Sequence, residues 1–296
     1  MLHAPPVVTA SPRFCAPGRH PLGSTPLGST IVMDLSVVIP VRNEAENVAP
    51  LVAEIRAALD GLCAYEIVYV DDGSTDATAA EIQRLMVQTP GLRLLRHRRS
   101  CGQSAAVRTG VKAARALWVA TIDGDGQNDP ADIPGLWDLA RAAPSTSPLL
   151  VTGYRRSRQD TWSKRAASRI ANRIRRRLLG DDTPDTGCGL KLFSRALFLD
   201  LPEFDHMHRF LPALVLRSGG EVLSVPVNHR PRQGGISKYG VLDRLGVGIV
   251  DLVGVMWLQR RATRPQLVAE PSLQSAPQTA PQAACAANSP AAPALR

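Results

Sequence analysis

The chain has 296 residues and a formal net charge of +9 at pH 7, from 35 Lys and Arg against 26 Asp and Glu. Apolar residues make up 44% of the chain and charged residues 21%, which is typical of folded proteins and excludes a wholly disordered chain. Five scattered cysteines exclude a disulfide framework and a C-x-x-C zinc site, and they favour a reducing compartment. We expect neither a signal peptide nor a membrane-spanning helix, because no apolar run is long and uninterrupted enough for either.

Both ends of the chain have the composition of disordered tails. Residues 1–32 are rich in Pro, Gly, Ser and Thr, and Pro-Leu-Gly-Ser-Thr occurs twice in tandem at 21–30. Met33 directly precedes the first strand-like run, so we expect it to be the true translation start. Residues 261–296 are dominated by Ala, Pro, Gln and Ser, which bury too little apolar surface to offset the entropy of ordering. One folded domain is therefore predicted at 33–260.

Within that domain, short β-branched runs alternate with helical patterns. The sequence predicts strands at 35–40, 66–70, 92–95, 117–122 and 149–153, and helices at 44–59, 76–87, 103–116 and 131–142. This alternation predicts an α/β fold with a mainly parallel central sheet flanked by helices. Ligands of such sheets bind at the carboxyl ends of the strands, so the residues that follow each strand are the candidate site.

Three of the predicted strands end in motifs that carry carboxylates, at Pro40–Glu44, Asp71–Asp76 and Asp123–Pro130. Asp76 is expected to cap the next helix. Two aspartates around a glycine, Asp123 and Asp125, can give hard oxygen ligands to a divalent cation that also takes diphosphate oxygens. The chain lacks the G-x-G-x-x-G and G-x-x-x-x-G-K-[ST] phosphate cradles, so a metal is expected to carry the phosphate charge.

In their order along the chain, these motifs resemble those of the inverting family 2 glycosyltransferases. Three later segments are similar to the dolichol-phosphate mannosyltransferase-like branch and its bacterial undecaprenyl-phosphate relatives: Asp-Thr-Gly-Cys-Gly-Leu-Lys at 185–191, Phe-Asp-His-Met-His-Arg-Phe at 204–210 and Gly-Gly-Ile-Ser-Lys-Tyr-Gly at 234–240. The resemblance covers about residues 34–258. It implies a single nucleotide-diphospho-sugar transferase domain, with a donor-binding half at 33–153 and an acceptor half with interfacial helices at 154–260.

The resemblance also implies the site residues. The residues expected to bind the donor are Pro40, Arg42, Glu44, Val70, Asp72, Asp123, Gly124, Asp125, Arg155, Arg232 and Lys238. A divalent cation, Mg²⁺ or Mn²⁺, is expected on Asp123, Asp125 and Gln127. Arg42 stands where the family commonly has an aromatic residue, and a flat guanidinium can still stack on a base. His206 and His208 are expected to be packed or hydrogen-bonded structural residues, with a place for His208 and Arg209 beside the acceptor phosphate as the alternative.

The implied reaction is the inverting, metal-dependent transfer of a sugar from a nucleotide diphosphate sugar to a polyprenyl phosphate. Asp125 and Lys238 are expected to be catalytic. The cation bound by Asp125 and the charge of Lys238 would both neutralise the negative charge that grows on the departing diphosphate. A phosphate nucleophile needs little help from a base, since its second pKa is about 6. For a hydroxyl acceptor, Asp185 is the nearest candidate base, with a turn residue as the alternative. Mannose from a guanosine donor, glucose from a uridine donor, and a modified arabinose or aminosugar all stay open.

A basic segment favours attachment to a membrane. Residues 155–177 hold ten Lys or Arg and one acid, and apolar residues recur every four positions from Trp162 to Leu178. A basic amphipathic helix with a tryptophan suits an anionic membrane surface. A second helical pattern, Leu242–Leu258, is too short and too charged to span comfortably. We expect peripheral attachment to the cytoplasmic face of the membrane.

Two other functions compete with this interpretation. A glycosyltransferase acting on a sugar hydroxyl in polysaccharide or glycolipid synthesis is the nearest, but a processive synthase would show several spanning helices and a Q-x-x-R-W motif, which Gln259-Arg260-Arg261 is not. The excess of basic over acidic residues also permits a non-enzymatic nucleic-acid-binding protein. Asp72, Asp123 and Asp125 at one sheet edge would repel a nucleic acid backbone, so no nucleic-acid partner is expected.

Overall fold

The computed structural model describes residues 33–143, 148–155, 175–231 and 241–263. In this part of the chain, seven strands form one sheet in the order β3-β2-β1-β4-β6-β5-β7. Neighbouring strands are parallel except β6, which is antiparallel to both β4 and β5. The strands are β1 (Leu35–Val41), β2 (Tyr65–Asp71), β3 (Leu92–Arg96), β4 (Trp118–Thr121), β5 (Leu149–Arg155), β6 (Lys191–Ser194) and β7 (Glu221–Val227). The predicted α/β fold with a mainly parallel sheet is confirmed.

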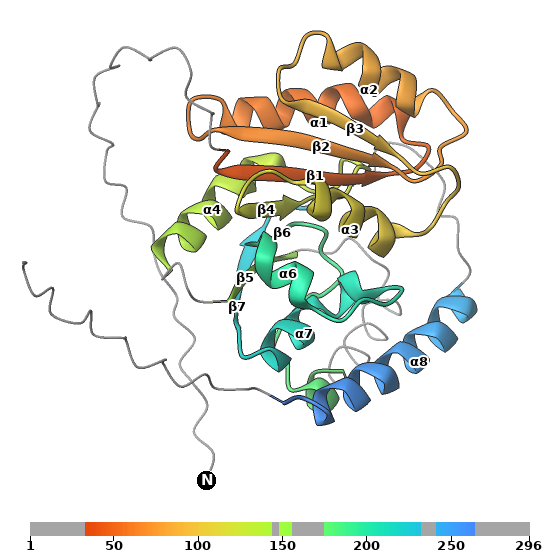
Figure 1. Cartoon of the computed structure of the whole chain (residues 1–296), viewed down its shortest axis with the longest axis vertical. Coiled ribbons are helices and arrows are strands. Elements are labelled where there is room, and N and C mark those ends of the chain that lie inside the picture. The colour runs from red at the N-terminus through yellow and green to blue at the C-terminus, as the bar shows by residue number, and fades with distance from the viewer. Residues whose placement is uncertain (1–32, 144–147, 156–174, 232–240, 264–296) are drawn as a thin grey trace, which may run out of the picture. The chain divides into compact units, whose positions relative to one another are not determined.

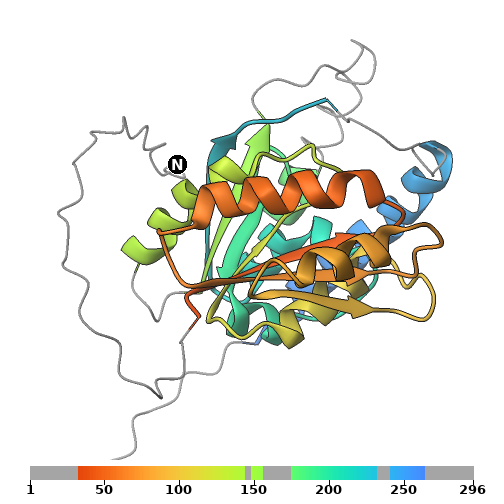
Figure 2. The same ribbon diagram turned by 90° about the horizontal axis from the view of Figure 1, so that it is seen from above.

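Helices cover both faces of this sheet (Figure 1). One buried apolar cluster joins the sheet to α1 (Ala45–Leu59), α2 (Thr78–Met86) and α4 (Ile133–Ala142), which follows the short helix η1 (Pro130–Asp132). Figure 2 shows α1 crossing over the strands on this face. The second cluster joins the opposite face to α3 (Gln103–Ala113), α6 (Arg195–Asp200), η2 (Met207–Arg209), α7 (Leu211–Arg217) and α8 (Val241–Arg260).

The burial of β1 shows why the sequence folds this way. Val37 and Ile39 belong to the cluster under α1, and Val38, between them, belongs to the cluster under α3. Successive side chains of a strand point to opposite faces, so a strand covered by helices on both sides is apolar throughout. The strands and helices expected up to residue 153 are confirmed, with their ends shifted by at most three residues.

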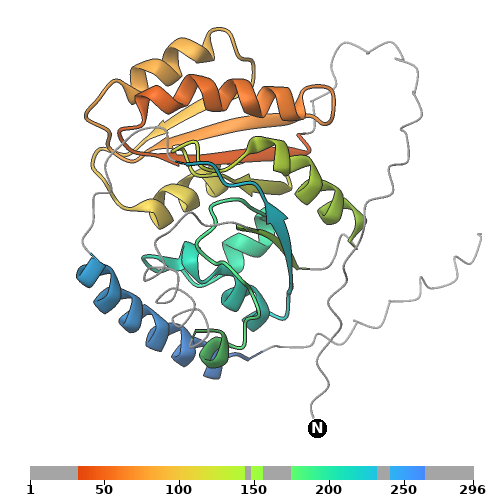
Figure 3. The same ribbon diagram turned by 180° about the vertical axis from the view of Figure 1, so that it is seen from behind.

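The later part of the chain extends the same sheet. β6 was not expected from the sequence, and it lies between β4 and β5, so the sheet runs continuously through both predicted halves. The helix expected at Leu242–Leu258 is confirmed as α8, which lies along the outer side of α7 (Figures 1 and 3). Most of the basic segment, including Trp162, lies outside the described residues. The structure describes its first residue, Arg155, and its last three residues, which begin the helical turn 175–179. None of the helices described is long and apolar enough to cross a membrane.

Candidate active site

The carboxyl ends of β1 and β4 and the start of β6 open onto a pocket of about 400 Å³. On one side lie Pro40 near the end of β1, Asp123 after β4 and Gln103 at the start of α3. The other side is made by the end of β5, the segment before β6, and the η2–α7 region, with Arg155, Lys191, His208, Arg209 and Leu211 among the lining residues. The pocket therefore brings one of the predicted carboxylates next to several cationic side chains.

Asp123 is held by its surroundings at the floor of this pocket. Gln103 Nε2 donates a hydrogen bond to Asp123 Oδ1 over 2.8 Å. An added Cβ at Gly189 would lie 2.2 Å from Asp123 Oδ2, so the carboxylate occupies space that any side chain at residue 189 would fill. Burial and the nearby charge of Asp125 raise the pKa of Asp123 to about 6, although Lys191 and Arg155 act to lower it.

Asp125, the second of the two carboxylates, stabilises the turn on which it lies. Its Oδ1 accepts a hydrogen bond from the backbone N–H of Gln127 at 3.1 Å. The backbone carbonyl of Gln127 in turn accepts from the N–H of Arg230, and Arg230 forms an ion pair with Asp129 at 2.7 Å. The chain that follows β7 therefore fixes the loop after β4. The expected role of Gln127 as a metal ligand stays a prediction.

The donor atoms after β4 fit a divalent cation of the Mg²⁺ or Mn²⁺ class. Asp123 and Asp125 give hard carboxylate oxygens, which these ions prefer. The two carboxylates lie close enough for Asp125 to raise the pKa of Asp123, and a cation between them would remove that repulsion. The chemistry of the residues therefore supports the metal position expected from the sequence.

Arg155 and Asp185 form a mostly buried, two-pronged ion pair. Arg155 Nε lies 2.5 Å from Asp185 Oδ2, and Arg155 Nη2 lies 2.9 Å from Oδ1. The side chains are 13% and 12% exposed, respectively. Burial alone would lower the pKa of Arg155, but the hydrogen bonds and charge of Asp185 raise it. Asp185 Oδ1 also accepts from the N–H of Gly187, so this carboxylate orients Arg155 on the pocket wall, and its role as a base stays a prediction.

Lys191 supplies a second cation at the pocket, and no role for it was expected from the sequence. It is 3% exposed, and its Nζ donates to the carbonyl oxygens of Thr186 and Cys188. Burial lowers its pKa, while the neighbouring Asp123 acts to raise it. Lys191 is the last residue of the 185–191 motif, and it reaches the pocket because β6 pairs with β4.

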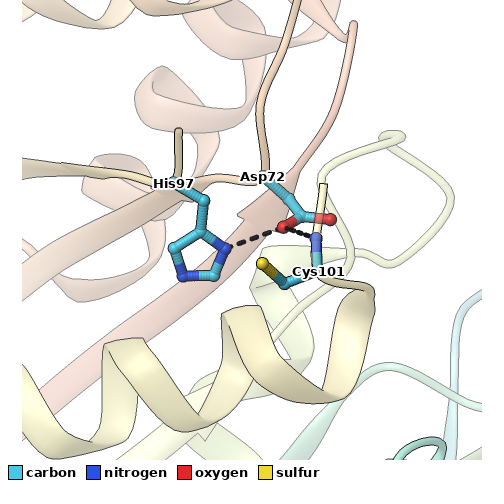
Figure 4. Close-up of side chains that lie close together, drawn as sticks. All are labelled: Asp72, His97 and Cys101. Carbon is cyan, nitrogen blue, oxygen red and sulfur yellow. Dashed lines mark hydrogen bonds and ion pairs between the residues drawn. The ribbon is translucent and has the colours of Figure 1, made fainter. Parts of the chain in front are cut away.

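Asp72 anchors the loop that leads into α3 (Figure 4). Its Oδ1 accepts from His97 Nδ1 and the Cys101 N–H, both at 2.7 Å, and its Oδ2 accepts from Ser100 Oγ and the Gly102 N–H. These hydrogen bonds lower the pKa of Asp72 even though burial raises it. The carboxylate therefore holds the segment directly before α3, the helix that carries Gln103 into the pocket.

Gly73 allows this loop to approach the end of β2. Its φ is +70°, a left-handed conformation that favours glycine. A Cβ at residue 73 would lie 2.8 Å from the backbone of Arg99 and Ser100, so a side chain would displace the loop.

The ligand atoms of Asp72, His97 and Cys101 lie within 4.8 Å of one another, a spacing that could suit a metal ion. Both oxygens of Asp72 already accept two hydrogen bonds each, and a cysteine sulfur is a soft ligand that Mg²⁺ and Mn²⁺ do not favour. This cluster fits the predicted cation less well than Asp123 and Asp125 do.

The other predicted donor-binding residues take different places. Arg42 is exposed, and Glu44 accepts a hydrogen bond from Asn47 Nδ2 at 2.7 Å. Val70 is fully buried in the core, and Gly124 lies so close to β1 that a Cβ would meet Val41 at 2.3 Å. None of these four lines the pocket just described. Arg232 and Lys238 lie outside the described residues. The donor-binding roles stay predictions.

A hydrogen-bonded pair that the sequence did not predict joins α3 to the η2–α7 side of the pocket. Ser104 Oγ lies 2.7 Å from His208 Nδ1, and the backbone N–H of His208 donates to the same Oγ at 3.3 Å. His208 has the hydrogen-bonded environment expected of a structural residue, and it also lines the pocket, so its role stays a prediction. His206 instead contacts α8, with its Nδ1 3.1 Å from Asp251. The one available signal was the position of His208 and Arg209 within the mostly polar 205–209 segment, between Phe204 and Phe210.

The aspartate predicted to be the N-cap of α2 lies one residue before the N-cap position, which Ala77 occupies, but it still satisfies a backbone N–H of the helix. Asp76 Oδ1 accepts a hydrogen bond from the N–H of Thr78, the first residue of the helix, at 3.0 Å. Its other oxygen accepts from the N–H of Ala45, at the start of α1. Asp76 therefore joins the beginnings of two helices beside the strand ends.

Comparison with known proteins identifies the relatives of this chain. The model of glycosyl transferase family 2 matches residues 36–201. A dodecaprenyl-phosphate galacturonate synthase of Rhizobium johnstonii is 36% identical over 238 residues, which cover 79% of this chain and 69% of the relative. An undecaprenyl-phosphate 4-deoxy-4-formamido-L-arabinose transferase of Edwardsiella ictaluri is 35% identical, with 74% and 66% covered. The chain thus spans about two thirds of the length of these relatives.

Solved structures share the fold. Glucosyl-3-phosphoglycerate synthase of Mycobacterium tuberculosis, in complex with Mg²⁺ and UDP, matches with a TM-score of 0.58 and 22% identity, covering 79% of this chain and 81% of that one. The same enzyme with Mn²⁺, UDP and phosphoglyceric acid matches with the same TM-score, covering 79% and 80%. At this level of identity, the likeness shows the fold alone.

Proposed function

The chain belongs to glycosyl transferase family 2, and on this premise we propose that it transfers a sugar from a nucleotide diphosphate sugar to the phosphate of a polyprenyl phosphate. The observation that carries the proposal is the pocket in which Asp123 faces the cationic side chains of Arg155, Lys191 and Arg209. Such a site suits two phosphate-bearing substrates, one held through a metal and one held by cations. The relatives named for dodecaprenyl and undecaprenyl phosphate support the choice of acceptor.

We propose that Asp123 and Asp125 hold Mg²⁺ or Mn²⁺, with Gln127 as a further ligand. When bound, such a cation neutralises negative charge on a diphosphate leaving group. Gln103 keeps Asp123 in place through its 2.8 Å hydrogen bond, and the Arg230–Asp129 ion pair fixes the far end of the loop. The mycobacterial synthase with the same fold has been solved with Mg²⁺ or Mn²⁺ beside UDP.

Arg155 is the protein's own cation for the substrate phosphates in this proposal. Asp185 holds its guanidinium in a fixed orientation through two hydrogen bonds. Lys191 adds positive charge from below, where its burial keeps solvent from screening it. The predicted phosphate contacts of Arg232 and Lys238 complete this set. The described chain reaches Pro231 close to the loop after β4, because Asn128 pairs with His229.

The reaction needs an oxygen of the acceptor phosphate to attack the anomeric carbon while the bond from that carbon to the diphosphate breaks. Attack from the opposite face inverts the anomeric configuration. A phosphate monoester with a second pKa of about 6 is mostly dianionic near neutral pH, so no side chain has to remove a proton. The engagement of Asp185 with Arg155 agrees with this, since a carboxylate bound to a guanidinium is a weak base.

We propose that the base and ribose of the donor lie along the ends of β1 and β2. Pro40 lines the pocket, and Arg42 and Glu44 follow it along the chain. The side chain of Val70 is buried, so a contact from this residue would come from its backbone. Asp72 would contact the ribose only by exchanging one of its four hydrogen bonds, and Gly124, whose side-chain position is occupied by Val41, would contact the nucleotide only through its backbone.

We also propose peripheral attachment to the anionic cytoplasmic face of a membrane, through α8. Ile249, Val250, Val253 and Trp257 are between 56% and 72% exposed, and they share one side of the helix. The opposite side packs on α7 through the fully buried Val255. Arg261 lies over the Trp257 ring, 5.6 Å from its centre. An exposed apolar face with arginines at its end suits an anionic lipid surface.

The test is a substrate panel. Purified protein is incubated with guanosine and uridine diphosphate sugars, with Mg²⁺, Mn²⁺ or chelator, and with either a polyprenyl phosphate or an oligosaccharide bearing only hydroxyl groups. The proposal predicts a metal-dependent glycophospholipid with one of the donors. Transfer to the oligosaccharide instead would favour the hydroxyl-acceptor alternative, and salt-sensitive RNA binding without any transfer would favour the nucleic-acid alternative.

A further inference from the structure

The pocket has a wall that the proposed chemistry of the donor does not use. Its residues come from η2 and the start of α7: His208, Arg209 and Leu211. The donor side of the pocket, in contrast, comes from β1, β4 and the first residue of α3. The η2–α7 wall holds a histidine, an exposed arginine and a leucine, a mixture of hydrogen-bonding, cationic and apolar groups.

The η2–α7 wall connects the pocket with α8. His208 faces the pocket, while His206, two residues earlier in the chain, contacts Asp251 of α8 over 3.1 Å. α8 carries the exposed apolar residues proposed to meet lipid. In the proposed function, a lipid phosphate that comes from that side would reach the η2–α7 wall, whereas the nucleotide would lie along the strand ends.

The hydrogen bonds of His208 are compatible with a neutral imidazole whose proton lies on Nε2. Burial, then the positive charges of Lys191 and Arg209, lower the pKa of His208 to about 3, so the imidazole is neutral. Ser104 Oγ accepts the His208 backbone N–H and lies 2.7 Å from Nδ1. A hydroxyl that accepts one hydrogen bond still has its own proton to donate. When Ser104 donates this proton to Nδ1, the imidazole proton is on Nε2, which becomes a donor.

We infer that His208 Nε2 and the Arg209 guanidinium bind the phosphate monoester of the lipid acceptor, with Leu211 beside the first part of its hydrocarbon chain. This inference rests on the proposed function and adds the acceptor's binding residues to it. A neutral N–H and a cation together suit an anionic oxygen, and hydrogen bonds to charged groups are the stronger kind. Ser104 acts as a positioning residue, because it sets the tautomer of His208 without contacting the phosphate.

The first test measures the Michaelis constants for farnesyl phosphate, a short and water-soluble polyprenyl phosphate, and for the active donor. His208→Ala is expected to raise the acceptor KM by about tenfold to a hundredfold, the range for a lost hydrogen bond to a charged group. The effect on the donor KM is expected to be several times smaller. His208→Gln, whose amide N–H can replace Nε2–H, should restore part of the loss, and Ser104→Ala should raise the acceptor KM by about threefold to tenfold.

The matched control is His206→Asn, which removes the neighbouring histidine. Asn tolerates the left-handed backbone found there, where φ is +65°. This variant is expected to keep the acceptor KM of the wild type. Equal KM increases for donor and acceptor in His208→Ala, or a normal acceptor KM in that variant, would overturn the inference.

The second test uses the wild-type protein, so it does not depend on whether a variant folds. The imidazole nitrogens are labelled with ¹⁵N, and the signal of His208 is followed by NMR as farnesyl phosphate, inorganic phosphate or UDP with Mg²⁺ is added. Farnesyl phosphate is expected to shift the signal at lower concentration than inorganic phosphate, with a proton on Nε2. A shift with UDP alone would assign His208 to the leaving diphosphate, and tighter binding of inorganic phosphate would exclude a lipid-phosphate site.

The two tests separate the inference from the proposed function. If wild-type protein makes the glycophospholipid but His208→Ala keeps its acceptor KM, the inference alone fails. If wild-type protein makes no such lipid with any donor, the proposed function fails, and the absence of an NMR shift with farnesyl phosphate would then reject the acceptor site as well.

Discussion

The two sides of the pocket are built in different ways. On the donor side, each carboxylate directly follows a buried strand, and Asp72 and Asp123 come one and two residues after the ends of β2 and β4. On the η2–α7 side, contacts join distant parts of the chain, such as Ser104 and His208, which are 104 positions apart. The donor side is thus encoded locally, and the opposite side depends on the packing of α3 against η2. Changes on the two sides should therefore have different consequences.

The largest effect is expected at the donor side. Asp123→Asn removes one of two carboxylates proposed to hold the cation, and transfer should fall by about a thousandfold. Glycolipid formation is measured across Mg²⁺ and Mn²⁺ concentrations. Asp138→Asn is the matched control, because that aspartate is 63% exposed on α4 and should leave the rate unchanged. Near-normal turnover in a folded Asp123→Asn protein would exclude the metal site.

The next effect concerns the anchor beneath the donor side. Asp72→Asn replaces a carboxylate that accepts four hydrogen bonds and is 7% exposed. The free energy of unfolding at pH 7 should fall by about 2–4 kcal/mol. The folded-state pKa is lowered, so this stability is present above the unfolded pKa of about 3.9 and is lost as the pH falls through the folded pKa.

The difference between wild type and Asp72→Asn should accordingly shrink below about pH 4. Denaturant unfolding at pH 7 and at several acid pH values measures it, with Asp138→Asn again as the control. A difference that stays constant across this range would show that the charge of Asp72 does not stabilise the loop before α3.

A smaller effect is expected for the ion pair between Asp185 and Arg155 on the pocket wall. Asp185→Asn leaves Arg155 with a neutral partner, and kcat/KM for a phosphate acceptor should fall by about tenfold to a hundredfold. Arg155→Lys should behave similarly, because lysine cannot make the two-pronged contact. The pH dependence of the rate distinguishes the roles of Asp185. Loss of its acidic limb in Asp185→Asn would identify a general base, and an unchanged profile at a lower rate is the expected result.

The smallest effect lies farthest from the chemistry, on α8. Trp257→Asp should weaken binding to anionic vesicles by about tenfold and leave transfer to soluble farnesyl phosphate unchanged. Leu117→Asp is the control, since Leu117 is 76% exposed and lies just before β4. Vesicle co-sedimentation measures both variants, and equal binding by the two would contradict a membrane-facing role for α8.

The contrast between the sides also explains what could be predicted from the sequence. The strands, the helices up to residue 153 and the positions of Asp123 and Arg155 were predictable, because buried parallel strands are continuous apolar runs and the site follows their ends. The hydrogen bonds of Asp72 were not, since they depend on how the 97–102 loop folds back over β2. Lys191 reaches the pocket through a strand pairing that its short, four-residue sequence does not reveal.

The same reasoning applies to the residues whose place the sequence left open. His206 and His208 were expected to be structural because two histidines two residues apart bind a metal only with further ligands, and the place of His208 in the pocket depends on a contact with α3. The pattern of α8 predicted a helix, but which of its sides meets α7 and which stays exposed follows from packing. Local periodicity therefore predicts the elements, whereas long-range contacts decide their roles.

The central claim is that an oxygen of the acceptor phosphate attacks the sugar, and the fate of that oxygen tests it most directly. A polyprenyl phosphate carrying ¹⁸O in its three non-bridging positions is incubated with the active donor and metal. The mass of the product and of its fragments is then measured by mass spectrometry. All three labels should remain in the glycophospholipid, with one joining the sugar to phosphorus. Loss of label, or a sugar attached through a hydroxyl group, would contradict the mechanism.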